Sequence, residues 1–507
     1  MQVHDKHFYL PLAWVLLLIV VFLVPLSITF LLLPIIVAFG IYQSRFLFVY
    51  YIKNHSKLIF FQFALSVTYF FLHRNSIALL EIWSDEIIGL RIASGALSQI
   101  ANQAVSTGMF PPYHYWELWY WQKVMLSFPP ELMEIILRIP SMTYHAFGAI
   151  MLSLILGKVY ERNRNASNTI TTLIRWSVFL LYFFQPLLFQ YAFEARPYSL
   201  IAFSGVVTLA ILELEKTVHF SDLYIQILLS LTSFIQTIRF VFQELVNSME
   251  RKISLDRIVT LSAITILYSL LCISIRKPIQ TTQLDTYNNI VQSYVVFQHM
   301  FLPGFFQFIV LLVGIGFSVH NTKRRSVIYQ IVFLFVIISF VSYEFRYVAF
   351  YPRHFILTVP FILYILFSWI TSPSRIIQLL GMIAVSIGFL IPWIVTSENN
   401  LVTKNFPPKV EITIKPHLKR ISPRTTIGLE EDPQDSGSTD YWRYRYQIYV
   451  AQWYLERYGY IDSIRVPTRD ICLYASKNLA MVITYTDSQC LADLRNIVKL
   501  DYKESIQ

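Results

Sequence analysis

The sequence predicts a polytopic, all-α membrane protein that ends in a small α/β domain outside the membrane. Hydrophobic residues make up 55% of the 507-residue chain and charged residues only 14%, against roughly a quarter charged in typical soluble domains. Uncharged runs such as 258–275, 304–320 and 376–395 are long enough to cross a hydrocarbon core about 30 Å thick as helices. Composition and run length together argue against a soluble fold.

Lysine and arginine outnumber the acidic residues, and the formal net charge is 41 − 31 = +10. In a soluble protein this excess could suggest nucleic acid, but here the cations gather in short loops between hydrophobic runs. The positive-inside tendency places these loops in the cytoplasm, and no nucleic-acid partner is expected. The basic clusters are Arg45/Lys53/Lys57, Lys158/Arg162/Arg164, Arg251/Lys252/Arg257, Lys323/Arg324/Arg325 and Arg375.

Residues 1–57 are expected to form an N-terminal hydrophobic anchor and a cytoplasmic loop. The apolar stretch 11–42 is too long for the core of a signal peptide and has no convincing cleavage site, so it should stay attached. It could cross once or form a hairpin around Pro25 or Pro34, and both readings stay open.

Residues 58–396 are expected to form the membrane domain, a bundle of about 11 core helices. The basic loops set the direction of each helix, so the acidic motifs near residues 85 and 194 both reach the extracytoplasmic side. Residues 223–246 start and end in the cytoplasm, and we interpret them as a shallow pair of short helices. The other helices are expected at 58–80, 139–157, 176–193, 197–212, 258–275, 304–320, 326–341, 355–370 and 376–396.

Two segments are expected outside the membrane. Residues 82–130 are too polar to span, and their aromatic patch at 110–121 suits the headgroup level. Residues 397–507 are expected to form the small α/β domain, with strands at 411–414 and 480–485, an amphipathic helix at 441–458 and a loop around 421–440.

Short motifs mark the ends of the hydrophobic runs. An acidic pair follows the first core run, a Pro-Pro-aromatic element comes next, and later runs begin at arginine-containing motifs. In chain order they are Trp83-Ser84-Asp85-Glu86, Pro111-Pro112-Tyr113, Arg138-Ile139-Pro140-Ser141, Glu194-Ala195-Arg196-Pro197-Tyr198 and Pro352-Arg353-His354-Phe355.

This series resembles the polyprenyl-phosphate-sugar-dependent membrane glycosyltransferases of the type C fold. The resemblance covers roughly residues 58–396 and is strongest to the branch of glycosyltransferase family 39 that contains protein O-mannosyltransferases and aminoarabinose transferases. Relatives commonly carry histidine before the Pro-Pro pair, whereas this chain has Phe110 there and His114 beyond it. His354 stands where tyrosine is usual.

The resemblance implies transfer of a hexosyl or pentosyl group from a polyprenyl-phosphate donor to a glycan, lipid or protein acceptor. Such a transfer needs a group to take the acceptor proton and cations to stabilise the departing phosphate. The resemblance assigns Asp85, with Glu86, as the catalytic carboxylates, and it implies single displacement with inversion. The competing reading is that both acids cap the following helix.

Arginines at the predicted outer helix ends could hold the phosphate by paired hydrogen bonds. Arg196 and Arg353 could bind it or could snorkel to the interface, as arginines at helix ends often do. Arg138 could bind phosphate or instead pair with Asp85 or Glu86. Glu194 could orient Arg196 or meet the sugar, and Tyr198 completes this binding set.

His114 is a further candidate, as a substrate ligand that could shuttle a proton or bind a metal. The sequence has no Cys/His cluster with zinc spacing, so no metal site is assigned, although a divalent metal is not excluded. No cofactor beyond the lipid-linked donor is expected.

The sequence thus favours an integral enzyme of the cell envelope, acting on the extracytoplasmic face of a bacterial plasma membrane. The alternative is a flippase or transporter of a lipid-linked saccharide, which would also need arginines and aromatics along a groove.

Overall fold

The structure, a computed structural model, describes part of the chain. The expected anchor at 11–42 and helix at 258–275 lie outside the described residues, as does most of the pair expected at 223–246. Described are residues 45, 47–53, 55–74, 84–96, 99–100, 103, 113–129, 132–162, 167–214, 225, 229, 232–233, 235–236, 238–240, 242–243, 291, 294–295, 304–319, 321–344, 355–403, 410–422, 425–431, 448, 450–460, 463–467, 481–484 and 497–499.

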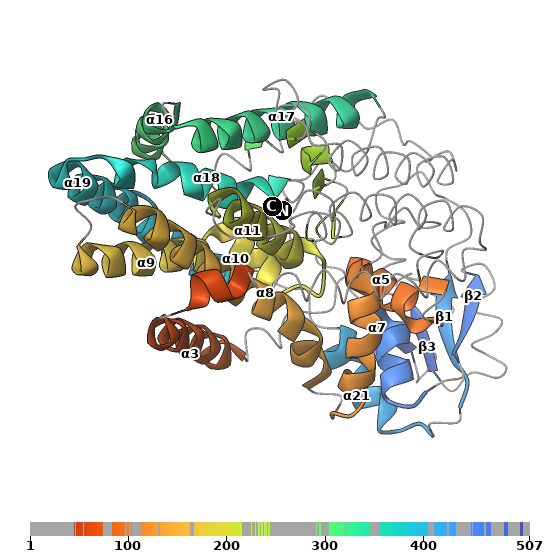
Figure 1. Cartoon of the computed structure of the whole chain (residues 1–507). Helices are drawn as coiled ribbons and strands as arrows, with labels where there is room; N and C mark the ends of the chain where they lie inside the picture. The colour runs from red at the N-terminus through yellow and green to blue at the C-terminus, as the bar shows by residue number, and fades with distance from the viewer. Residues whose placement is uncertain are drawn as a thin grey trace, which may run out of the picture. The chain divides into compact units, whose positions relative to one another are not determined.

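These residues are mostly helical, with short strands near the C-terminus (Figure 1). They form two compact units. The first unit takes its residues from 1–70, 95–117 and 140–398, and the second from 71–94, 118–139 and 399–507.

Helices lie at every described run that the hydrophobic pattern predicted in residues 58–396. Most begin or end within a few residues of the expected bounds, although α3 ends earlier, α8 and α9 begin earlier and α20 ends later. They are α3 (Ser56–Leu72), α8 (Met133–Glu161), α9 (Asn168–Phe183), α10 (Pro186–Ala192), α11 (Tyr198–Glu213), α16 (Phe305–Val319), α17 (Thr322–Glu344), α18 (Thr358–Leu366), α19 (Arg375–Val385) and α20 (Ile391–Thr403).

The single helix expected at 176–193 is wrong, because the chain breaks between α9 and α10 and bends there by 64°. Pro186 has no amide hydrogen to continue the α9 ladder, and proline favours the first turn of a new helix. The Gln185 side chain caps that turn by accepting from the Leu188 amide at 2.7 Å. The helix expected at 355–370 is likewise interrupted, since α18 gives way to a 3-10 turn, Ser368–Thr371.

Helix α18 is the centre of the first unit. All of its residues are buried, as expected for a helix that is apolar all round, and it packs against α11, α16 and α17 (Figure 1). Two glycines allow this close approach. A Cβ atom added to Gly314 of α16 would lie 2.7 Å from the carbonyl oxygen of Ile365. A Cβ atom added to Gly205 of α11 would lie 3.0 Å from the carbonyl oxygen of Leu357, so a larger residue at either position would clash with the backbone.

Several helices turn polar residues inward and large apolar residues outward. In α3 the buried side chains are Gln62 and Ser66, while Phe60 is 66% exposed. In α16, Gln307, Gly314 and Ser318 are among the buried residues, and Phe305 is 79% exposed. This is the reverse of the pattern on a surface helix in water, where the apolar stripe faces the core.

Among the described residues, two helical segments are long and apolar enough to cross a membrane, Met133–Glu161 and Arg375–Ser397. The bent pair α9 and α10 would make a third span. A π turn, Ser386–Leu390, lies inside the second segment, and Gln307 donates a hydrogen bond to its Gly388 carbonyl at 2.6 Å. The predicted number of spans stays a prediction.

The second unit contains a parallel sheet of the strands β1 (Ile427–Glu431), β2 (Ser463–Pro467), β3 (Met481–Thr484) and β4 (Ile497–Lys499), in the order β2-β1-β3-β4 (Figure 1). The strand expected at 480–485 is confirmed as β3, and residues 450–457 are helical as expected.

Two expectations for this unit are wrong. Residues 411–414 belong to a helix, α21 (Val410–Leu418), because Ile414 and Leu418, four residues apart, are buried together. That spacing places both on one helical face. The loop expected around 421–440 contains β1, which pairs with β2 and β3 from much later in the chain.

Candidate functional site

Three of the predicted binding residues meet at the turn between α10 and α11. Tyr198 begins α11, and Pro197 precedes it, since its fixed φ suits a helix start. Glu194 and Arg196 occupy the turn and lie 3.9 Å apart as an ion pair. The Arg196 Nη2 also donates to the Tyr198 hydroxyl at 2.9 Å, and its guanidinium carbon is 4.8 Å from the centre of that ring.

This turn is largely buried. The Arg196 side chain is 14% exposed and that of Glu194 is 9% exposed. The Tyr198 ring packs against Tyr191 with ring centres 4.5 Å apart, and Ser199 donates to the Tyr191 carbonyl at 3.0 Å. These contacts fix the guanidinium close to a carboxylate and a phenol, an arrangement that suits recognition of a phosphate or a sugar hydroxyl.

His114 lies against the same turn. Its Nε2 is 3.3 Å from the Ala195 carbonyl oxygen, and its Nδ1 is 3.8 Å from a carboxylate oxygen of Glu117. The histidine is the second residue of α7 (Tyr113–Met125), and its side chain is buried. The structure therefore brings His114, Glu194, Arg196 and Tyr198 into one group.

Sequence reasoning missed two members of this group, Glu117 and Tyr144. The Tyr144 hydroxyl donates to Glu117 at 2.7 Å, and one turn earlier on α8 the Ser141 hydroxyl donates to the Arg196 carbonyl at 3.4 Å. Burial, followed by the nearby Glu117 carboxylate, raises the pKa of Tyr113. The three-residue spacing of His114 and Glu117 was the available signal, because it places both on one helical face.

Two further predicted residues pair in the second unit. Glu86, in α5 (Ser84–Ser94), lies 3.5 Å from Arg138, and both side chains are completely buried. A buried charge pair of this kind is costly to break from either side. The geometry favours the pairing alternative for Arg138 over a direct phosphate contact.

Asp85 is the second residue of α5, next to the buried Glu86. The structure describes the backbone of Asp85 but not its side chain. Arg353 also lies outside the described residues. A neighbouring contact joins the start of α8 to the C-terminal region of this unit, where the Tyr454 hydroxyl donates to Glu134.

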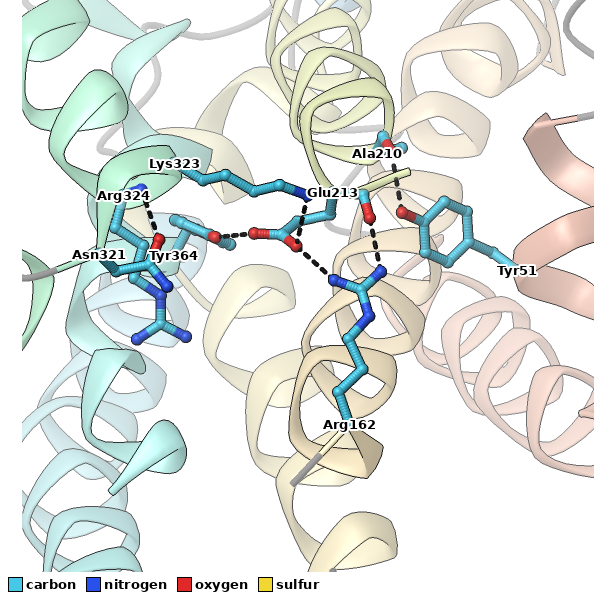
Figure 2. Close-up of polar contacts among 8 residues, drawn as sticks. All are labelled: Tyr51, Arg162, Ala210, Glu213, Asn321, Lys323, Arg324 and Tyr364. Carbon is cyan, nitrogen blue, oxygen red and sulfur yellow. Dashed lines mark hydrogen bonds and ion pairs between the residues drawn. The ribbon is translucent and has the colours of Figure 1, made fainter. Parts of the chain in front are cut away.

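A second polar cluster, which we call the Glu213 cluster, surrounds the last residue of α11 (Figure 2). Its carboxylate accepts from the Tyr364 hydroxyl, pairs with Arg162 at 2.7 Å and lies 3.6 Å from Lys323. Arg162 also donates to the Glu213 carbonyl at 2.5 Å. A carboxylate at a helix C-terminus opposes the helix dipole, so these cations and donors are needed to stabilise it.

A third polar network lies farther along the helices. The buried Arg239 donates to Gln236 at 2.7 Å and to Gln330 at 3.2 Å, and Gln236 donates to Ser204 at 2.7 Å. At a rise of 1.5 Å per residue, Ser204 lies about 9 Å from the start of α11 and Gln330 about 12 Å from the start of α17. This arginine was not singled out by the sequence.

The described residues contain no group of three or more histidine, cysteine or acidic side chains arranged to hold a metal ion. Comparison with known proteins finds no matching family model, no matching curated protein and no matching solved structure.

Proposed function

We propose that the chain is a membrane glycosyltransferase that moves a sugar from a polyprenyl-phosphate donor to an extracytoplasmic acceptor hydroxyl. The observation that supports it best is the group at the α10–α11 turn. There an arginine, two acids, a histidine and two tyrosines converge where two apolar helices end. Motif order and family resemblance supply the reaction type.

The inside-out helices support the membrane setting. Phe60, Phe305 and Ile376 are each more than half exposed on helices whose buried faces carry glutamine or serine. Water would penalise such apolar surfaces, whereas lipid chains would solvate them. The C-terminal domain is proposed to lie outside the bacterial plasma membrane, together with the site.

In the proposed reaction the acceptor hydroxyl oxygen attacks the anomeric carbon of the sugar. The bond between that carbon and the phosphate oxygen breaks, and the lipid phosphate leaves with the bonding electrons. The resemblance gives Asp85 the role of the base that takes the hydroxyl proton. Within the first unit, Arg196 is the residue proposed to stabilise the negative charge on a departing phosphate. Glu86 and Arg138, as a buried pair, hold the first turn of α5 and thereby position Asp85.

The test is sugar transfer in membranes that carry Asp85→Asn. The carboxamide keeps the size of the side chain but is a poor base, so turnover should fall by roughly 10²- to 10⁴-fold. Binding of the lipid donor should persist. Transfer at the wild-type rate by this variant would reject Asp85 as the base, and absence of transfer by the wild-type protein with every donor tried would reject the enzyme.

One observation favours the alternative, a carrier of a lipid-linked saccharide. Arg239 lies in a polar network well inside the helices, and transporters often place charge at such depth. A flippase assay with Arg239→Gln separates the two functions. A carrier should lose transbilayer movement of the lipid, whereas an enzyme should keep transfer and show no such movement in the wild type.

A further inference from the structure

Glu117 has two carboxylate oxygens in different surroundings. Oε1 accepts the hydrogen bond from Tyr144 at 2.7 Å. Oε2 is buried, and no donor within the described part of the chain is hydrogen-bonded to it. The His114 Nδ1 lies 3.8 Å from it, which is too long for a hydrogen bond. A buried carboxylate oxygen without a donor is unfavourable, so this atom is suited to receive one from a ligand.

The surrounding contacts hold Glu117 beside the α10–α11 turn. His114 lies one helical turn before it and contacts the Ala195 carbonyl. Tyr144, which holds Oε1, follows Ser141 by one turn of α8, and Ser141 donates to the Arg196 carbonyl. Two separate routes therefore connect Glu117 to the backbone of Ala195 and Arg196. The orientation of its carboxylate is set before a ligand binds.

The chemistry of the surroundings narrows the class of ligand. A carboxylate oxygen accepts O–H or N–H donors or coordinates a metal, and the described residues hold no group of three or more histidine, cysteine or acidic side chains that would share a metal with Glu117. Aromatic rings lie near this carboxylate. Tyr144 packs against Phe203 with ring centres 5.8 Å apart, and Tyr113 lies close enough to Glu117 and Tyr144 to interact with both. A sugar fits such surroundings, because its hydroxyls can donate to the carboxylate while its apolar faces pack against the aromatic rings.

We propose that Glu117 is a sugar-binding residue whose Oε2 accepts a hydrogen bond from a hydroxyl of the donor sugar. We assign Glu117 to the sugar of the donor and not to the acceptor. In the donor the sugar is bonded directly to the phosphate that Arg196 is proposed to hold, so a residue near the Arg196 turn is placed to contact that sugar. This inference rests on the proposed function and adds a determinant of sugar recognition to it.

The experiment measures binding of short-chain probes to the full chain in lipid nanodiscs. The probes are farnesyl phosphate and farnesyl phosphates that carry mannose, glucose, galactose or arabinose. The wild-type protein should prefer one sugar-bearing probe over bare farnesyl phosphate. Glu117→Gln should reduce that preference by about tenfold or more, with binding of the bare probe unchanged. Arg196→Ala should weaken both.

Matched variants separate sugar contact from folding. Glu161→Gln neutralises a carboxylate at the far end of α8, where it pairs with Arg175, and should leave the preference intact. Glu117→Asp keeps the negative charge, but its carboxylate is one methylene shorter and no longer reaches the sugar. This variant should therefore lose the preference for the sugar-bearing probe, and it tests the assignment even if Glu117→Gln folds poorly.

Unchanged sugar preference in Glu117→Asp overturns the assignment, as does unchanged preference in a folded Glu117→Gln. If the wild-type protein transfers sugar in membranes while these variants keep their preference, only the Glu117 assignment fails. If the wild-type protein neither transfers sugar nor distinguishes the probes, the proposed function fails and this inference fails with it.

Discussion

Arg196 is held by two neighbours before any ligand arrives, Glu194 and Tyr198. Such preorganisation lowers the entropy lost when a guanidinium binds phosphate, because the planar group is already oriented. These two contacts also distinguish Arg196 from an arginine that only extends toward lipid headgroups. Arg74, at the end of α3, is exposed, donates to the Phe71 carbonyl and lies over the Phe71 ring. This contact pattern resembles interfacial snorkelling.

The two arginines therefore make a matched pair for mutation. Arg196→Ala should cost about 2 to 5 kcal/mol of transition-state stabilisation, because the departing phosphate loses its charged partner. Arg196→Lys should restore only part of this, since lysine lacks the planar fork. Arg74→Ala should leave transfer kinetics near normal. The measurement is kcat/KM for sugar transfer in membranes, and equal kinetics for the two alanine variants would return Arg196 to the snorkelling interpretation.

At the scale of the elements, the Glu213 cluster joins four helices or their ends: α8 through Arg162, α11 through Glu213, α17 through Lys323 and α18 through Tyr364 (Figure 2). Arg162 and Lys323 are partly exposed, so their attraction to the carboxylate is partly screened by solvent. The buried Tyr364 hydroxyl still depends on the Glu213 carboxylate as its acceptor, and the Glu213 carbonyl depends on Arg162 as its donor. The Glu213 cluster therefore links these apolar helices through hydrogen bonds and ion pairs.

Glu213→Gln should lower the free energy of unfolding by about 1 to 3 kcal/mol, because the amide cannot satisfy two cations and a phenol at once. Thermal unfolding of the purified protein in detergent measures the change. The control is Glu456→Gln, which removes an exposed carboxylate that accepts a hydrogen bond from Gln452 and should cost less than about 1 kcal/mol. Equal melting temperatures for wild type and Glu213→Gln would show that the cluster contributes little to stability.

Hydrophobic runs predicted the helices well, because each run needs only its own composition to be recognised. The break at Phe184–Gln185 was missed although Pro186 marked it, since the apolar pattern continues across the proline. The strand at 411–414 was misassigned because Val410, Ile412 and Ile414 alternate as in a strand, and only packing shows the helical pair Ile414 and Leu418. Strand β1 was missed since its partners lie at 463–467 and 481–484.

The candidate site was predicted in part. Glu194, Arg196 and Tyr198 are adjacent in sequence, so their grouping follows from one turn. Glu117 gains its role only from Tyr144 on another helix and from His114 against Ala195, and a single sequence without these contacts does not reveal it.

At the scale of the whole molecule, the proposed function depends on a topology that puts the site and the C-terminal domain on the same side. Arg162 and Lys323, which come from two of the basic clusters, contact the same Glu213 carboxylate. We therefore expect these two clusters on one side of the membrane, and the positive-inside tendency predicts that this side is the cytoplasm. Helices α8 and α11 run from Met133 and Tyr198 toward the Glu213 cluster. Their starting ends, including the turn with Arg196, are therefore expected on the extracytoplasmic side.

A reporter that is active only outside the cytoplasm should report activity when fused after residue 400, and a fusion near Lys323 should be silent. A second fusion after residue 164 is the control, because Arg162 and Lys323 contact the same carboxylate and must lie on one side. The physical reason is the cost of carrying clustered lysines and arginines across the membrane, which retains them in the cytoplasm. If the fusions at 323 and 400 are both silent, the chain between them crosses an even number of times, and not the three times expected at 326–341, 355–370 and 376–396. The C-terminal domain would then lie in the cytoplasm, away from the proposed extracytoplasmic site.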